Sequence, residues 1–153
     1  MKLLVTGGLG FIGSNFILKM LKDNSDLEIL NIDAELDGAD KKNLNDLENS
    51  DNYEFVKGNI SNKKFMEEQI SRCDAVVNFA AQTHVDRSIS DADPFLVSNI
   101  RGTFTILQII TKQKKRMIQI STDEVFGSLY DSSATEQSRF NPSSPYAATK
   151  ASA

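Results

Sequence analysis

The chain has few of the residues that stabilise small secreted or metal-dependent folds. Its 153 residues include one cysteine, Cys73, one histidine, His84, and no tryptophan. A lone cysteine forms no internal disulfide, and no zinc-ligand spacing surrounds it, so we expect neither a disulfide scaffold nor a metal site. We interpret Cys73 as a buried apolar residue in a reducing, cytoplasmic setting, and His84 as a structural residue.

Charge of one sign and long apolar runs are also scarce. The net charge is -4 and the hydrophobic share is 40%, which is typical of a globular protein. The basic stretch 112–116 is interpreted as a solvated helix end, so nucleic acid is not an expected partner. Glycines interrupt the apolar N-terminus from Gly7 onward, so it predicts neither a signal peptide nor a membrane span.

Short apolar runs alternate with segments of helical periodicity. The runs lack polar alternation and therefore predict strands that are buried on both faces. The expected strands are 3–5, 28–32, 53–56, 75–79 and 117–120. The expected helices are 11–21, 62–70 and 94–112, with a weak helix or loop at 41–47. This order predicts an α/β fold, a Rossmann-type doubly wound parallel sheet of about five strands.

The last part of the chain predicts a loop followed by the start of a helix. The stretch 127–144 is rich in serine and predicts the loop, and Pro145 suits the first turn of a helix. On helix 94–112, helical spacing predicts one apolar side. That side comprises Phe95, Leu96, Ile100, Phe104, Leu107 and Ile110.

The turn 6–13 is glycine-rich and lies between the first strand and the first helix. Gly7, Gly10 and Gly13 would allow a tight turn, close approach of a pyrophosphate and close helix–strand packing. Asp33 ends the second strand, where an acidic side chain holds the ribose hydroxyls and repels a 2′-phosphate, so NAD is favoured over NADP. The alternative is a turn that needs glycine for its shape alone.

Two further constellations carry chemistry. Tyr146 and Lys150 are spaced to share one helix face, where an ammonium would lower the phenol pKa and make the tyrosine a general base. Asp123 and Glu124 follow the fifth strand, where two carboxylates serve as acid and base if their environments differ. The alternatives are a solvated helix face and a solvent-facing acidic turn.

Together these motifs resemble the dTDP-glucose 4,6-dehydratases of the extended short-chain dehydrogenase/reductase superfamily. The resemblance runs through 5–13, 79–89, 99–103, 121–127 and 142–151. It implies NAD-dependent oxidation at C4 of a nucleotide-activated hexose, loss of water across C5 and C6, and return of the hydride to C6. The Asp123-Glu124 pair separates this family from related epimerases and decarboxylases, which are the alternative enzymes.

The resemblance also implies roles for individual residues. Tyr146 would be the base at the C4 hydroxyl, assisted by Lys150 and Thr122. Glu124 would take the C5 proton, and Asp123 would protonate the leaving C6 hydroxyl. For the cofactor, Phe11 and Ile12 would contact the pyrophosphate, and Asp33 would bind the ribose. Asn59 and Ile60 would contact the adenine. The cofactor channel beside Tyr146 and Lys150 would be lined by Phe79, Ala80, Ala81 and Ser98. Thr83 would lie near both nicotinamide and sugar.

Three positions depart from the family pattern: the stretch 34–39, which replaces a Leu-Thr-Tyr-Ala-Gly sequence, Asn59, which replaces an aspartate, and Gln82, which replaces a glutamate. Members of the family run to more than double this length, so residues 1–153 correspond to the NAD-binding domain, truncated within the Tyr-x-x-x-Lys helix and without the substrate domain. We expect a homodimer for the full-length enzyme. For this chain alone we expect negligible dehydratase activity and marginal stability, and a non-catalytic dinucleotide-binding fragment is the second class.

Overall fold

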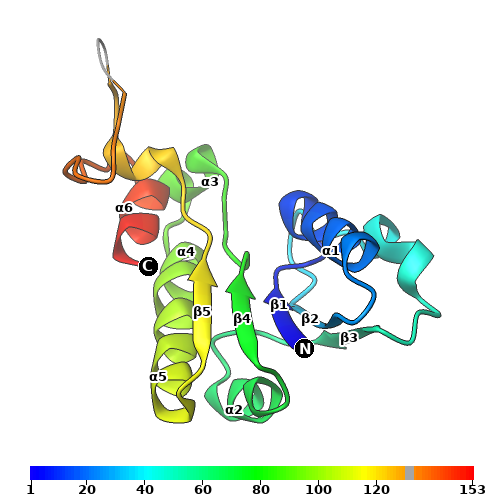
Figure 1. The fold of residues 1–153 in the computed structure, drawn as a ribbon. Helices are drawn as coiled ribbons and strands as arrows, with labels where there is room; N and C mark the ends of the chain where they lie inside the picture. Colours follow the sequence, from blue (N-terminus) through cyan, green and yellow to red (C-terminus); the bar gives the residue numbers. More distant parts are fainter. Residues whose placement is uncertain (130–132) are drawn as a thin grey trace.

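A five-stranded parallel sheet forms the centre of the computed structural model, which describes residues 1–129 and 133–153 (Figure 1). The strands are β1 (Lys2–Thr6), β2 (Glu28–Asp33), β3 (Tyr53–Lys57), β4 (Ala75–Asn78) and β5 (Arg116–Gln119). Their order is β3-β2-β1-β4-β5, and every neighbouring pair is parallel. The order reverses between β1 and β4, where doubly wound sheets bind ligands at the carboxyl ends of their strands. The predicted fold class is confirmed.

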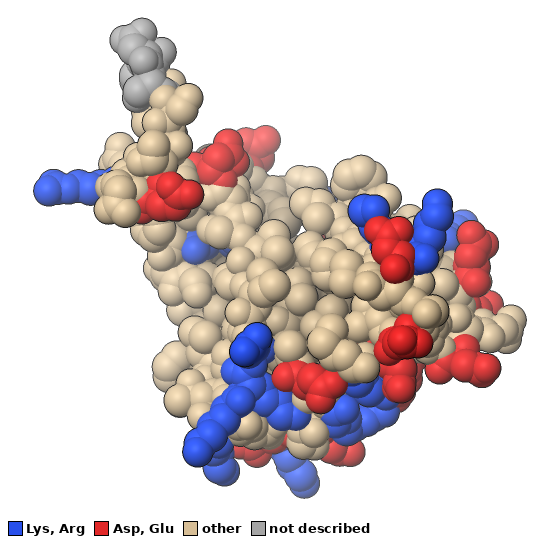
Figure 2. Space-filling model, viewed as in Figure 1, with Lys and Arg blue, Asp and Glu red and all other residues tan. Residues whose placement is uncertain are grey.

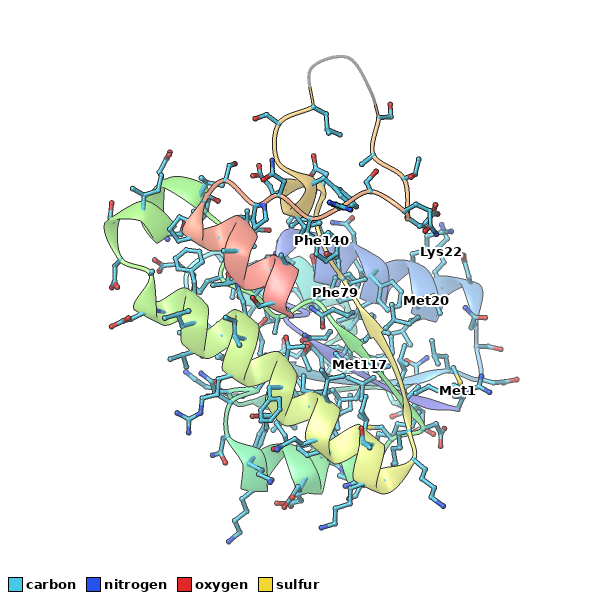
Figure 3. The ribbon with its side chains drawn as sticks, turned by 90° about the vertical axis from the view of Figure 1, so that its left-hand side faces the viewer. Met1, Met20, Lys22, Phe79, Met117 and Phe140 are labelled. Atoms are coloured by element: carbon cyan, nitrogen blue, oxygen red, sulfur yellow. The ribbon has the colours of Figure 1, made fainter. Side chains whose placement is uncertain are left out.

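Helices cover both faces of the sheet. The α-helices are α1 (Phe11–Asp23), α2 (Lys63–Ser71), α3 (Val85–Ser90), α4 (Asp93–Phe95), α5 (Thr103–Gln113) and α6 (Pro145–Ser152). The other helical segments are η1 (Lys41–Leu47) and η3 (Asp123–Phe126), both 3-10, and η2 (Leu96–Gly102), which is a π-helix. Figures 1 and 3 show α1 on one face of the sheet and α5 with α6 on the other.

The core has two layers because successive strand residues point to opposite faces. On β1, Leu4 joins the cluster beneath α2 and α5, where Met66 and Ile106 are fully buried. Val5 joins the cluster beneath α1, with Ile17 at its centre. Burial of each such side chain stabilises the fold by about 1.5–3 kcal/mol. The strands in the middle of the sheet lack polar alternation because helices cover both of their faces.

The expected helix 94–112 is interrupted by a π-helical segment. Segments α4, η2 and α5 follow one another, and η2 has the i→i+5 bonding that inserts one extra residue. One extra residue rotates the following side chains by about 100°. The predicted apolar side is partly wrong. Phe95 and Ile110 are buried, but Phe104 and Leu107, which follow η2, are exposed, and so is Leu96 at its start.

Residues 85–90 form the short helix α3. One local prediction needs correction. In the basic stretch 112–116, Lys115 is half-buried and not a free solvated cation, and its ammonium group donates to the carbonyl oxygens of Ile70, at 2.7 Å, and Ser71, at 3.0 Å. It thus caps the C-terminal end of α2, where free carbonyls favour a cation.

One face of β4 and β5, on the side of α1, is bare. Figure 2 shows few charged side chains in the middle of this face and many around its rim. An apolar groove there is lined mainly by β1, α1, β4 and β5, and Met1 and Met20 lie on the side of the sheet away from α5 (Figure 3). Within the described residues, no helix has the length and hydropathy that a membrane crossing requires.

Candidate functional site

A cleft of about 540 Å³ opens at the carboxyl ends of β1, β2 and β4. All of the residues predicted to contact the cofactor line this cleft. They are Gly7, Gly10, Phe11, Ile12, Gly13, Asp33, Asn59, Ile60, Phe79, Ala80, Ala81, Thr83, Ser98, Tyr146 and Lys150. Their roles stay predictions, but the fold brings them to one place from across the chain.

The glycine-rich turn is shaped by steric limits. Gly7 has a positive φ of 70°, and a Cβ there would lie 2.5 Å from the Ala80 nitrogen. A Cβ on Gly13 would lie 2.4 Å from the Gly7 oxygen. Gly10 is the N-cap of α1 and makes no side-chain cap. The first N–H groups of α1 are therefore open to an anion in the cleft.

The Asp33 carboxylate is held in a fixed orientation by two backbone donors. Oδ2 accepts from the Leu9 nitrogen at 3.0 Å, and Oδ1 accepts from the Glu35 nitrogen at 2.8 Å. Each carboxylate oxygen can accept a further hydrogen bond. The side chain lines the cleft and is therefore positioned to accept from a pair of hydroxyl groups.

The loop after β2 contributes lining residues that the sequence interpretation missed. These are Ala34, Leu36, Asp37, Gly38 and Ala39, all within the stretch that departs from the family pattern. Asn59, in the loop after β3, also lines the cleft. Its Oδ1 accepts from the Ser61 nitrogen at 2.9 Å and from the Ser61 hydroxyl at 2.8 Å. The acceptor of Asn59 is thus occupied within its own loop.

The segment after β4 is fixed by Asn99, a buried residue of η2. Its Oδ1 accepts from the Gln82 nitrogen at 2.8 Å, and its Nδ2 donates to the Gln82 oxygen at 3.0 Å and to Thr149 Oγ1 at 2.9 Å. Asn99 therefore ties the cleft segment to α6. Sequence reasoning assigned it no role, and the signal was weak, because Asn99 lies between the polar residues Ser98 and Arg101.

The fold places Tyr146 and Lys150 on α6, with both side chains lining the cleft. The Lys150 ammonium donates to the Ile120 oxygen at 2.6 Å and is largely buried. The Tyr146 nitrogen donates to Ser88 Oγ at 3.0 Å, and its ring meets Phe95 edge-on at 6.3 Å. Ser88 thus acts as a second cap for the first turn of α6, beside the N-cap Ser144.

The expected lowering of the Tyr146 pKa is wrong for this structure. Burial raises the pKa of the phenol, a hydrogen bond with Thr122 opposes that rise, and the charges of Glu124 and Asp123 add to it. Burial also lowers the pKa of Lys150, whose ammonium is directed at the Ile120 oxygen. The tertiary surroundings therefore outweigh the helical spacing of the two side chains.

Residues Thr122, Asp123 and Glu124 stand beside Tyr146 at the start of η3 and outside the lining of the cleft. Thr122 Oγ1 accepts from the Glu124 nitrogen at 3.3 Å and donates to Asp123 Oδ1 at 3.2 Å. Asp123 is exposed and Glu124 is half-buried. The two carboxylates therefore have different environments, as separate acid and base roles require.

Among the described residues, no three His, Cys, Asp or Glu side chains are placed to hold a metal ion. The side chains available for catalysis are therefore a tyrosine, a lysine and two carboxylates in or beside a cleft of about 540 Å³. His84, interpreted from the sequence as a structural residue, also lines the cleft.

Comparisons with known proteins agree on one family. A sequence profile of the GDP-mannose 4,6 dehydratase family matches residues 4–153. The chain is 43% identical over 156 residues to a dTDP-glucose 4,6-dehydratase of Mycobacterium tuberculosis and 44% identical over 154 residues to the low-salt glycan biosynthesis protein Agl12 of Haloferax volcanii. These alignments cover 100% of this chain, but 46% and 49% of those relatives.

Among solved structures, DesIV of Streptomyces venezuelae, a dTDP-glucose 4,6-dehydratase with NAD and TYD bound, superposes with a TM-score of 0.95 at 40% identity. The match covers 99% of this chain and 49% of that one, so the chain spans about half the length of the relatives it matches. The resemblance predicted from the motifs is confirmed. The chain belongs to the GDP-mannose 4,6 dehydratase family.

Proposed function

We propose that the chain binds NAD and carries the catalytic groups of a dTDP-glucose 4,6-dehydratase. The observation that carries this proposal is that Tyr146 and Lys150 line the same cleft as Asp33, with the Asp123-Glu124 pair beside Tyr146. Two relatives with this name, both from Mycobacterium tuberculosis, are 43% identical to the chain over 156 residues.

The cleft fits a dinucleotide in three respects. The turn at Gly7 and Gly13 leaves no room for side chains, so a pyrophosphate can approach the backbone. The uncapped start of α1 offers N–H groups and the positive end of the helix dipole. Asp33 is oriented to accept from ribose hydroxyls and would repel a 2′-phosphate. NAD, when bound, would supply the hydride acceptor for C4 and the hydride donor for C6.

In the proposed reaction the protein groups move protons. Tyr146 removes the proton of the C4 hydroxyl, with Thr122 hydrogen-bonded to the phenol and Lys150 one helical turn further along α6, also in the cleft lining. Glu124 takes the C5 proton and returns it to C5 when the hydride reaches C6, and Asp123 gives a proton to the C6 hydroxyl, which leaves as water. Thr83 lines the cleft, and we expect it to lie near both the sugar and the nicotinamide. The raised pKa of Tyr146 means that this base needs a neighbouring positive charge to work at neutral pH.

A titration calorimetry experiment with NAD and NADP tests the cofactor part. We expect saturable binding with a preference for NAD, which weakens by more than about tenfold in Asp33→Ala. Asp26→Ala is the matched control, because Asp26 is an exposed carboxylate in the turn before β2. A folded chain that binds neither dinucleotide contradicts the proposal.

The activity of the chain by itself is a separate question. Catalysis uses binding energy from the non-reacting part of the substrate, and half the length of the relatives is outside the match. We therefore infer negligible dehydration of dTDP-glucose by the chain alone at stoichiometric concentration, followed as loss of water by mass spectrometry. Turnover in that assay would show this inference to be wrong, and NAD binding without turnover also fits a non-catalytic dinucleotide-binding module.

We also propose that the family's dimer contact uses the exposed side of η2 and α5. Val97, Phe104 and Leu107 leave apolar surface uncovered there. Analytical ultracentrifugation of Phe104→Glu against the parent chain tests this, with a shift toward monomer expected. An unchanged sedimentation profile would place any self-association elsewhere.

A further inference from the structure

Glu35 lies within the loop that departs from the family pattern and has an unusual backbone. Its φ is positive, at 55°, in a region that side chains other than glycine rarely occupy. Its neighbours Ala34 and Leu36 line the cleft, while its own side chain does not. Its nitrogen donates to Asp33 Oδ1 at 2.8 Å. The conformation thus orients the Asp33 carboxylate, which would bind the ribose, and turns the Glu35 side chain away from the cleft.

Two lysines meet the Glu35 carboxylate. Lys57 Nζ lies 2.6 Å from Oε2, and the Lys41 ammonium contacts Oε1. Hydrogen bonds from Lys41 and Lys57 lower the pKa of Glu35, so the group is ionised at neutral pH. Lys41 also lies over the Phe55 ring, at 5.2 Å from the centroid.

Both lysines come from elements that border the ribose end of the cleft. Lys57 is the register partner of Asp33 in the sheet. The next residue, Gly58, lines the cleft and donates its N–H to the backbone carbonyl oxygen of Asp33. Lys41 begins η1, two positions after the lining residue Ala39. The chain therefore carries two cations next to the carboxylate that would hold a ribose.

We propose that Glu35 is a determinant of cofactor specificity, because it retains the two cations that a 2′-phosphate at this ribose would recruit. The inference rests on the proposed NAD site. Sites that accept NADP neutralise the 2′-phosphate with a nearby cationic side chain. Asp33 opposes that phosphate by its charge, and Glu35 keeps Lys41 and Lys57 from compensating. The preference for NAD then depends on two carboxylates, of which the sequence motif contains only Asp33.

The test is calorimetric titration of four proteins with NAD and with NADP: the parent chain, E35Q, the triple variant E35Q/K41M/K57M and the control E28Q. Glutamine keeps the size of the side chain and the backbone N–H to Asp33. Glu28 pairs with Lys2 at 3.7 Å at the opposite end of β2, so E28Q makes the same charge change far from the cleft. Circular dichroism checks that each variant is folded.

In E35Q we expect NADP to bind at least about tenfold more tightly than in the parent, with the NAD dissociation constant within about threefold. The gain should shrink in high salt, because exposed charges are screened over about 10 Å at 0.1 M ionic strength. It should also disappear in the triple variant and be absent in E28Q.

Three results would overturn the inference. These are an unchanged NADP affinity in E35Q, a gain that persists in the triple variant, and an equal loss of NAD affinity, which would mean that Glu35 acts only by shaping the loop. Failure of the proposed function looks different, because a folded parent chain would then bind no NAD, and the inference would fall with it.

Discussion

Replacing Asn99 by alanine should destabilise the chain by about 3 kcal/mol. The side chain is 1% exposed and makes three hydrogen bonds. Its loss leaves the N–H and the carbonyl of Gln82 without partners, at about 1 kcal/mol each in a half-buried site, and leaves a small cavity worth about 1 kcal/mol. Thr149 loses least, because its hydroxyl keeps its bond to the Tyr146 oxygen at 2.8 Å.

The assay is urea unfolding followed by circular dichroism, with the free energy of unfolding taken by linear extrapolation. The matched control is Asn15→Ala, since Asn15 is an exposed asparagine whose Nδ2 donates to the Phe11 oxygen at 2.8 Å. We expect that control to change stability by less than about 0.5 kcal/mol. A loss below about 1 kcal/mol in Asn99→Ala, or one equal to the control, would refute the reasoning that this residue joins the cleft to α6.

Three further predictions concern packing and ionisation. Gly13→Ala should weaken NAD binding by more than about tenfold in calorimetry, because the new Cβ would lie 2.4 Å from the Gly7 oxygen; an unchanged affinity would show that the turn can shift at little cost. Burial raises the pKa of Cys73 from 9.0 to about 11, so the folded state holds more protons than the unfolded state between these two pH values. The free energy of unfolding should therefore fall by about 2–3 kcal/mol as pH rises from 9.0 to about 11. Urea unfolding of Cys73→Ala over the same pH range should lack this decline. Burial lowers the pKa of Lys150, so the unfolded state holds more protons just below 10.5 and the parent gains stability as pH rises toward that value. Lys150→Met should therefore be more stable than the parent by about 1 kcal/mol at pH 7, with the difference closing near pH 10.5, and a constant difference across pH would argue against a buried ammonium as its cause.

The strands could be predicted from sequence because a parallel sheet with helices on both sides favours short apolar runs in its strands. The last residue of β2 and the last residue of β4 each differ by one position from the predicted ends of these strands. The glycine turn and Asp33 were also predictable, because their spacing is set by backbone geometry within one βαβ unit. These features depend on neighbours in sequence, which the sequence itself displays.

The π-helical segment was not predictable in the same way. Helical periodicity assumes a constant rotation per residue, so it placed Phe104 and Leu107 on the core side, where the structure has them exposed. The bonds of η2 are compatible with the pairing of Asn99 with Gln82 and Thr149, which belong to segments 17 and 50 residues away. A contact of that range leaves no mark in the local pattern.

The same limit applies to cofactor specificity. A glutamate two positions after the ribose aspartate suggests, from sequence alone, a second negative charge facing the ligand. The positive φ of Glu35 instead turns its carboxylate toward Lys41 and Lys57, which come from two other elements. A chain with Asp33 and the two lysines but a neutral residue at position 35 would carry the same nucleotide-binding motif and yet present free cations beside the ribose. The motif therefore predicts which dinucleotide binds only when the partners of its neighbouring charges are known.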